Sequence, residues 1–312
     1  MTGGHGGLGR IGALTLATQY RCDLILAGRN RQRVEQAAHR LRGQTGAKVE
    51  VLMLDLGSLE SVRAAAAECK TMLRAGKRTD VGLQSIVCNA GMQTRGAATY
   101  STDGYEETFA SNCLGHFLLV NLLLDSIAAD GRIIWTSSGT HDPFTTEGRF
   151  IGNPVAPDAG SLAHQGRDGK AVSGARRYAT SKLCLVLYAY EMDRRMRQAG
   201  TSQSSIAYDP GFIPELGLGR EAPSVLRSGI AKFVLGKLGM TMGKMPLSGE
   251  ALAMLALDPA FEGRSGKYFR SKNGTLSEAS SSVVSYDLGK AAKLWTDSVD
   301  LVKLNQISAI PS

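Results

Sequence analysis

The chain has 312 residues, of which 43% are hydrophobic, and this is enough apolar material for a globular protein with a full core. Its formal net charge of +8 suits an anionic ligand, but the basic residues are scattered and accompany no nucleic-acid-binding motif. The longest apolar stretch, 113–129, contains His116, Asn121 and Asp125 and therefore indicates a buried helix, not a transmembrane segment. The scattered basic residues lead us to expect that the protein binds no nucleic acid. Because no apolar leader precedes the first motif, we expect a cytoplasmic protein.

Short apolar runs alternate with longer helical patterns along the chain, which is typical of βαβ units around a parallel sheet. The predicted strands are 23–27, 49–54, 85–88, 132–136, 205–208 and 266–269. The predicted helices are 9–20, 31–42, 59–75, 105–129, 175–199, 249–257 and 287–304. The pattern predicts one α/β domain over residues 1–312, with a doubly wound parallel sheet.

Two segments interrupt this alternation, and both lie where a doubly wound sheet places its ligand-binding loops. Residues 139–177 are rich in Gly, Pro, Asp and Thr and are predicted to form an extended loop. Residues 214–246 contain an amphipathic stretch, 224–240, which is typical of a packed helix. We interpret this insertion as a helical lid over an apolar substrate.

The five cysteines lie far apart with no paired spacing. Such spacing favours reduced thiols packed as small hydrophobic residues over disulfides or a metal site. We therefore expect no bound metal.

A glycine-rich loop, Thr2 to Gly9, leads directly into the first predicted helix. Backbone amides at a helix N-terminus can receive a pyrophosphate, so the loop favours a Rossmann-type dinucleotide site. About 20 residues further on, where such a fold reads the ribose, the chain has Gly28 and Arg29 in place of an acid. An arginine there favours the 2′-phosphate of NADP, although Arg29 is also compatible with a surface residue that opens a helix.

Only Met1 precedes this loop, whereas a sheet of this kind has its first, central strand there. We therefore expect the first strand to be truncated and its neighbours to be left unpaired.

Tyr178 and Lys182 are predicted to lie one turn apart on the same face of a helix. A nearby ammonium favours the phenolate, so Lys182 is expected to bring the phenol towards working pH for proton transfer. The same Tyr-x-x-x-Lys spacing recurs at Tyr268/Lys272 and Tyr286/Lys290. Asn273 and Gly274 predict a turn directly after Lys272, so that pair is not expected to share a helix face. Only Tyr178 follows a strand that ends in small hydroxyl residues, 136–138, which favours this pair as the catalytic one.

Together these motifs resemble the short-chain dehydrogenase/reductase family over nearly the whole chain. The glycine pattern is met by Thr2, Gly3, Gly7 and Gly9, and the Asn-Ala-Gly motif by residues 89–91. The catalytic residues that the resemblance implies are Asn112, Ser138, Tyr178 and Lys182. The cofactor-binding residues that it implies are Gly3, His5, Gly7, Leu8, Gly9, Arg29, Asp55, Leu56, Asn89, Ala90, Gly91, Tyr178, Lys182, Pro210, Gly211 and Ile213.

The resemblance implies that NADPH delivers a hydride, Ser138 holds the substrate oxygen and Tyr178 transfers the proton. Lys182 would bind the nicotinamide ribose, and Asn112 would hold a water that links Lys182 to solvent. Asn89 and Asp55 are equally compatible with structural roles, as polar groups that stabilise a strand end or a turn. Helices of this family often form subunit interfaces, so a homodimer is also implied.

The long segment 139–177 and the C-terminal region resemble the subgroup of protochlorophyllide reductases and retinol-dehydrogenase-like enzymes. Residues 209–214 are similar to a Pro-Gly loop of the family, with Pro210 and Gly211 as its Pro-Gly pair. Pro214 replaces a threonine that is usual near the end of this loop, and Phe212 stands where the light-driven reductase has a cysteine. We therefore predict an NADPH-dependent enzyme that interconverts a carbonyl and an alcohol on a bulky lipophilic substrate. The alternatives are a reductase of a carbon–carbon double bond and a dinucleotide-binding protein without turnover.

Overall fold

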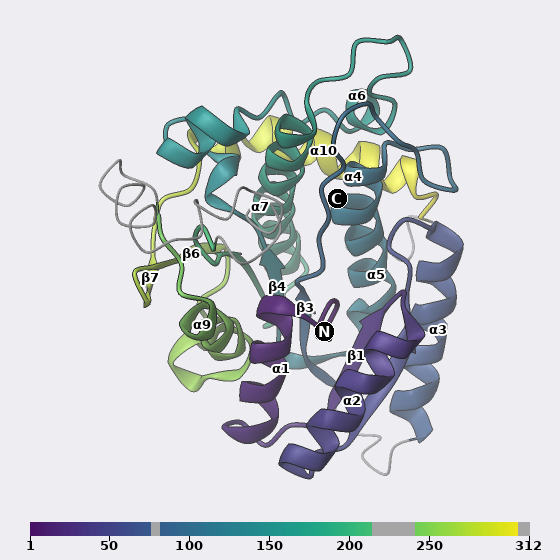
Figure 1. Ribbon diagram of the computed structural model, residues 1–312, viewed down its shortest axis with the longest axis vertical. Coiled ribbons are helices and arrows are strands. Elements are labelled where there is room, and N and C mark those ends of the chain that lie inside the picture. Colours follow the sequence, from purple (N-terminus) through teal and green to yellow (C-terminus); the bar gives the residue numbers. More distant parts are fainter. Residues whose placement is uncertain (76–81, 214–240, 305–312) are drawn as a thin grey trace.

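The computed structural model describes residues 1–75, 82–213 and 241–304, and it has a mostly parallel sheet with helices on both faces (Figure 1). Two parallel strands form one part of the sheet, β1 (Leu24–Gly28) and β2 (Val49–Met53). Five strands form the other part, in the order β3 (Leu83–Cys88), β4 (Ile127–Thr136), β5 (Ser204–Asp209), β6 (Lys267–Lys272) and β7 (Thr275–Glu278). Only the last pairing, of β6 with β7, is antiparallel.

The two parts of the sheet meet at residues 1–3, which lie between β1 and β3. The Met1 amino group donates to Ile25 O (2.8 Å), and Gly3 N donates to Ala27 O (3.0 Å). On the other side Thr2 N donates to Val87 O (3.0 Å). As expected, β1 and β3 do not pair with each other, and these three residues connect them near their carboxyl ends.

Helices cover both faces of the sheet and bury two hydrophobic clusters. One cluster contains side chains of α1 (Gly7–Thr18), α2 (Arg31–Thr45) and α9 (Met245–Leu257), and in Figure 1 α1 and α9 lie side by side. The other contains side chains of α3 (Leu59–Ala75), α5 (Gly115–Leu123), α7 (Gly174–Gln198) and α10 (Leu288–Leu301). Every residue of β5 is buried, as expected for a parallel strand covered on both faces.

Local sequence signals set the ends of several helices. The Asn30 side chain accepts from Arg33 N and caps α2, and Gly46 ends the helix in the left-handed region at φ 71°. The Ser173 side chain accepts from Arg176 N and caps α7, which agrees with the predicted helix 175–199. The turn predicted after Lys272 is also confirmed, since Asn273 and Gly274 have positive φ and connect β6 to β7.

The single helix predicted over 105–129 is wrong at both ends. The segment is divided into α4 (Glu107–Phe109), a π-helical turn (Ala110–Leu114), α5 and a 3-10 turn (Leu124–Ser126). Strand β4 then begins at Ile127, which pairs with Leu83 before a register shift in the ladder. An apolar run cannot by itself distinguish a buried helix from a buried strand, and here the pairing with β3 decides.

The segment predicted as an extended loop, 139–177, contains regular turns. These are the 3-10 turn Gly139–His141, the π-helical turn Gly148–Gly152 and α6 (Ala159–Ala163). Short 3-10 turns also lie at Pro259–Phe261 and Val283–Tyr286. Most of the predicted lid, 214–240, lies outside the described residues, and no described helix is long and apolar enough to cross a membrane.

Candidate active site

A cleft of about 630 Å³ lies at the carboxyl ends of the parallel strands, where a doubly wound sheet binds its ligands. Its volume is within the range of about 300–1,000 Å³ typical of small-molecule sites. All the residues predicted for the site line this cleft: Gly3, His5, Gly7, Leu8, Gly9, Arg29, Asp55, Leu56, Asn89, Ala90, Gly91, Asn112, Ser138, Tyr178, Lys182, Pro210, Gly211 and Ile213. The fold therefore brings segments from both halves of the chain to one place.

The glycine loop has a geometry that side chains would obstruct. Gly3 and Gly7 have φ of 65° and 49°, in the region that favours glycine. A Cβ on Gly9 would lie 2.4 Å from the Gly3 carbonyl oxygen, whereas one on Gly6 would meet nothing within 4 Å. The first turn of α1 has no side-chain cap and no acidic residue, so its amides and helix dipole can receive an anion.

Thr2 fixes this loop to β3 and α5. Its hydroxyl accepts from the backbone amides of Asn89 and Ala90, both at 3.0 Å. Burial lowers the pKa of His116 to about 4, so the ring is neutral. Its Nδ1–H donates to Asn112 O (2.9 Å), which leaves Nε2 to accept from the Thr2 hydroxyl (2.9 Å).

The Asn89 and Asp55 side chains have structural contacts as well as places in the cleft wall. Asn89 Nδ2 donates to Thr2 O (3.1 Å), and Asp55 Oδ1 accepts from Gly57 N (3.0 Å). Both side chains therefore have the structural contacts expected of polar groups at a strand end or a turn, and both residues also line the cleft.

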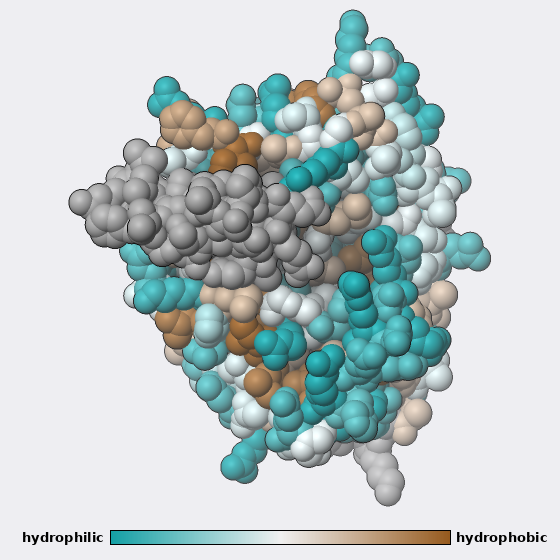
Figure 2. All heavy atoms as spheres, viewed as in Figure 1, coloured by the Kyte–Doolittle hydropathy of each residue, from teal (hydrophilic) through white to brown (hydrophobic). Residues whose placement is uncertain are grey.

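Basic side chains gather at the end of the cleft beside β1 and α2. Arg29, Arg33 and Arg40 are exposed and line the cleft, and Figure 2 shows a hydrophilic surface over α2. The sequence interpretation missed Arg33 and Arg40, although with Gln36 their spacing of three and four residues places them on one helix face. Burial, with Arg33 nearby, lowers the pKa of His5, whose Nδ1 is buried with no hydrogen-bond partner among the described residues.

Tyr178 and Lys182 lie on α7 at the centre of the cleft. Lys182 Nζ is 5.4 Å from the centroid of the Tyr178 ring and donates to Thr136 O (2.8 Å). Burial raises the pKa of Tyr178 to about 12, although the hydrogen bond with Ser138 acts in the opposite direction. Burial lowers the pKa of Lys182 to about 8. In this structure the pKa of the Tyr178 phenol is therefore not brought towards working pH, because desolvation outweighs the other effects on both groups.

Asn112 lies in the π-helical turn and is fully buried. Its side-chain oxygen accepts from Met92 N (2.8 Å), and its amide donates to Met92 O (2.9 Å) and Ser181 Oγ (3.0 Å). The side chain thus ties the segment after β3 to α7, one residue from Lys182. The water predicted at Asn112 stays a prediction.

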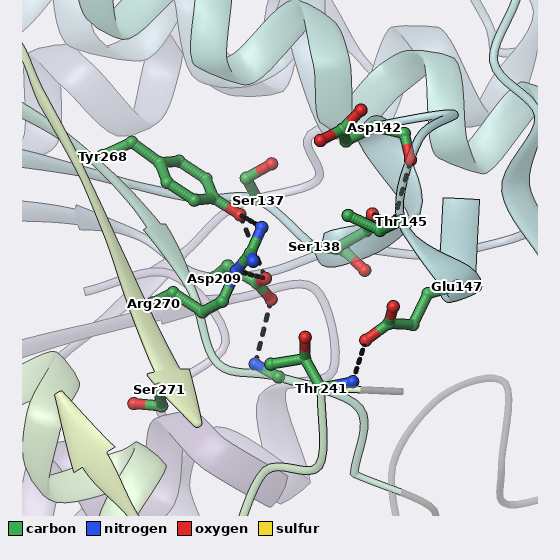
Figure 3. Close-up of polar contacts among 12 residues, drawn as sticks. Ser137, Ser138, Asp142, Thr145, Glu147, Asp209, Thr241, Tyr268, Arg270 and Ser271 are labelled. Carbon is green, nitrogen blue, oxygen red and sulfur yellow. Dashed lines mark hydrogen bonds and ion pairs between the residues drawn. The ribbon is translucent and has the colours of Figure 1, made fainter. Parts of the chain in front are cut away.

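A buried charge cluster supports the Pro-Gly loop at the end of β5. Asp209 is fully buried, and its Oδ1 accepts from Gly211 N (2.9 Å). Its Oδ2 accepts from Tyr268 Oη (3.0 Å) and from Arg270 Nε (3.2 Å) (Figure 3). Gly211 has φ 76°, and a Cβ there would lie 2.6 Å from Ser271 O, so this turn requires glycine. The sequence interpretation missed Asp209 and Arg270.

The other two Tyr-x-x-x-Lys pairs do not line the cleft. Tyr268 lies on β6 and donates to Asp209, whereas Tyr286 ends a 3-10 turn and is 52% exposed. Position in the fold, and not spacing, distinguishes Tyr178 from them.

A glycine loop at a helix N-terminus, beside a Tyr/Lys pair at the carboxyl edge of a parallel sheet, defines a dinucleotide-binding oxidoreductase of the α/β class. The family model described as short chain dehydrogenase matches residues 1–145. The chain is 32% identical over 321 residues to a chloroplastic protochlorophyllide reductase of Chlamydomonas reinhardtii, covering 98% of this chain and 77% of that protein. It is also 32% identical over 315 residues to retinol dehydrogenase 13 of Mus musculus, covering 100% of this chain and 85% of that protein.

Solved structures agree with this assignment. An uncharacterised protein from Mycobacterium paratuberculosis superposes with a TM-score of 0.70 and 26% identity, covering 100% of this chain and 93% of that chain. A short chain dehydrogenase from Burkholderia cenocepacia has the same fold, with a TM-score of 0.63 and 17% identity over 88% of this chain and 95% of that chain. The protein belongs to the short-chain dehydrogenase/reductase family, and it resembles the subgroup of protochlorophyllide reductases and retinol dehydrogenases.

Proposed function

We propose that the protein is an NADP(H)-dependent oxidoreductase that interconverts a carbonyl and an alcohol on a bulky lipophilic substrate. One observation carries the proposal: Ser138, Tyr178 and Lys182 line the same cleft as the glycine loop. A dinucleotide held on that loop and the Tyr178 phenol on α7 would therefore meet at one substrate carbonyl, whose carbon would take the hydride and whose oxygen would take the proton.

The cleft wall fits a dinucleotide. The crowded backbone at Gly9 and the uncapped first turn of α1 suit a pyrophosphate, and the buried, unpartnered Nδ1 of His5 lies beside Gly28 at the end of β1. Arg29, Arg33 and Arg40 supply the charge that a 2′-phosphate needs. The Burkholderia cenocepacia dehydrogenase was solved in complex with NADP, which supports the same choice. When bound, NADPH supplies the hydride.

The residues of the chain supply the proton. With a pKa of about 12, the Tyr178 phenol keeps its proton at neutral pH and is ready to donate it to the oxygen of a carbonyl that is being reduced. The Ser138 hydroxyl, which hydrogen-bonds Tyr178, is placed to hold that same oxygen. In the opposite direction Tyr178 must first lose its proton, which a protonated Lys182 favours.

The names of the relatives motivate the substrate class and a second candidate function. Retinol dehydrogenase 13 and polyprenol dehydrogenase, which is 29% identical to this chain, are named for long apolar alcohols. The protochlorophyllide reductases support reduction of a carbon–carbon double bond as the second candidate. Phe212, which lines the cleft where those enzymes are expected to have cysteine, favours the carbonyl reaction.

The test is NADPH oxidation with large apolar aldehydes and ketones, in the dark and under illumination, by the wild type and by Tyr178→Phe. We expect Tyr178→Phe to lose about 10²- to 10⁴-fold in kcat, the usual contribution of a general acid, while NADPH binding is retained. Tyr286→Phe is the matched control, because it alters an exposed tyrosine with the same spacing to a lysine. Equal activity of Tyr178→Phe and the wild type would refute the proposed role. Light-dependent reduction of a pigment precursor alone would favour the second candidate, and absence of turnover with every compound would favour a binding protein.

A further inference from the structure

Glu147 is a buried carboxylate in the cleft wall to which neither the family motifs nor the proposed proton transfer assigns a role. It is 2% exposed, and it lies at the start of the π-helical turn Gly148–Gly152. Its Oε1 accepts from the backbone amide of Thr241, and Figure 3 shows the side chain pointing from its own segment towards Thr241. Its Oε2 is buried and has no hydrogen-bond partner among the described residues.

An unpartnered carboxylate oxygen is unfavourable unless a donor reaches it in the functional state. Burying a charged oxygen without a hydrogen bond leaves its loss of hydration uncompensated. The nearby cation Arg270 contacts Asp209 through Nε (3.2 Å) and Tyr268 Oη through Nη2 (3.4 Å), and among the described residues it makes no hydrogen bond to Oε2. Among the described residues Oε2 therefore has no donor, and it can accept a hydrogen bond from a molecule in the cleft.

The position of Glu147 is fixed by its own segment. Thr145 Oγ1 donates to Gly139 O (3.0 Å) and accepts from Gly148 N (3.0 Å), which folds the segment back onto the end of β4. A Cβ on Gly148 would overlap Asp142 O, so this fold requires glycine next to Glu147. The carboxylate is thus held and is not a side chain that swings freely.

Glu147 lies near Ser138, one of the proposed catalytic residues. A Cβ on Gly139, the residue after Ser138, would be 3.6 Å from Glu147 Oε1. Phe212 also lines the cleft, and its backbone amide donates to Thr241 O (2.7 Å), the residue whose own amide contacts Glu147. A substrate whose oxygen contacts Ser138 would therefore present a neighbouring part of its body to Glu147.

We propose that Glu147 is a specificity-determining residue that accepts a hydrogen bond from an O–H or N–H group of the substrate, close to its reacting carbon. This inference rests on the proposed oxidoreductase function and narrows its substrate class. The preferred substrate is a bulky apolar carbonyl compound or alcohol that also carries a hydrogen-bond donor, and not a plain hydrocarbon chain.

The probes are hydroxynaphthaldehydes, each ring isomer paired with its methyl ether. Each pair keeps the apolar body and the aldehyde but differs in one donor. We expect the wild type to prefer at least one hydroxyl isomer over its ether by about 10- to 100-fold in kcat/KM, mostly through KM, because a hydrogen bond to a charged group contributes about 1.5–3 kcal/mol.

Glu147→Gln makes the test specific. The carbonyl oxygen of the introduced side-chain amide can still accept from Thr241 N, while the amide NH₂ group, which only donates, takes the place of Oε2. The preference should therefore fall to near unity or reverse in favour of the ether. Asp142→Asn is the matched control, because it removes a negative charge from the same segment. Asp142 accepts from Phe144 N and does not line the cleft.

Direct binding separates this inference from the proposed function. Titration of the NADPH-loaded Tyr178→Phe protein with each pair measures the preference without turnover. Equal binding of every hydroxyl compound and its ether, or equal effects of Glu147→Gln on both, would overturn the role of Glu147. Absence of turnover in the wild type together with a clear binding preference would overturn the proposed reaction and leave the role of Glu147 supported.

Discussion

The two sides of the cleft are built in different ways. The proposed cofactor side, formed by the glycine loop, α1 and α2, consists of backbone turns, a helix N-terminus and exposed arginines. The proposed substrate side, formed by segment 139–148 and the end of β5, contains buried charges that contact distant segments, such as Glu147 with Thr241 and Asp209 with Arg270. The comparison indicates that one side is specified by local sequence and the other by tertiary contacts, and the following changes test this difference.

The largest effect is expected on the substrate side. Asp209→Asn leaves Arg270 without its anionic partner, and breaking such a buried pair costs about 3–5 kcal/mol in the free energy of unfolding. Chemical denaturation of the wild type and of Asp209→Asn measures this difference in the free energy of unfolding. Tyr268→Phe, which removes one neutral hydrogen bond to Asp209, should cost only about 1 kcal/mol. Similar losses for the two variants would show that the charge is not what matters.

The second-largest effect is expected on the proposed cofactor side, in the Kd for NADPH. In Gly9→Ala the added Cβ would lie 2.4 Å from Gly3 O, so the loop must move. We expect the Kd for NADPH to rise about 100-fold, or about 2.7 kcal/mol. Gly6→Ala is the control, since its Cβ meets nothing within 4 Å. Equal Kd values for the two variants, measured by fluorescence titration, would contradict the crowding argument.

A smaller effect is expected in the pH dependence of stability. The folded state holds the pKa of His116 at about 4, below its ordinary value of 6.5, chiefly through burial. Between these values only the unfolded chain takes up the proton, so the stabilisation present above pH 6.5 is lost as the pH falls towards 4. From pH 7 to pH 5 the wild type should lose about 2 kcal/mol more than His116→Gln, which does not titrate. Denaturation curves at the two pH values test this, and parallel losses would argue against a neutral, buried His116.

The smallest effect is expected for cofactor choice. Arg29→Gln should raise the Kd for NADPH about 10-fold and leave that for NADH unchanged, because an exposed charge-assisted contact contributes about 1.5 kcal/mol. Arg31→Gln is the control, because Arg31 pairs with Glu35 on the surface and does not line the cleft. Equal weakening of both nucleotides by Arg29→Gln would favour a structural role for Arg29.

Much of the fold was predictable because its signals are local. Helix α7, the strand that precedes the Pro-Gly loop and the turn after Lys272 all agree with the sequence pattern. The prediction of one helix over 105–129 was wrong at its end, because residues from Ile127 onward form β4, which pairs with β3. The regular turns within 139–177 follow from contacts such as Thr145 with Gly139, which no periodicity reveals.

The sequence by itself determined the glycine loop, the order of the catalytic motif and the candidate residues, because each depends on residue type and near neighbours along the chain. Only the tertiary structure decided that Tyr178, and neither Tyr268 nor Tyr286, faces the cleft, and that burial raises its pKa. It also placed Glu147 in the cleft wall next to the residue after Ser138. Burial and proximity depend on how distant segments pack, and one chain read in order does not contain that information in any local pattern.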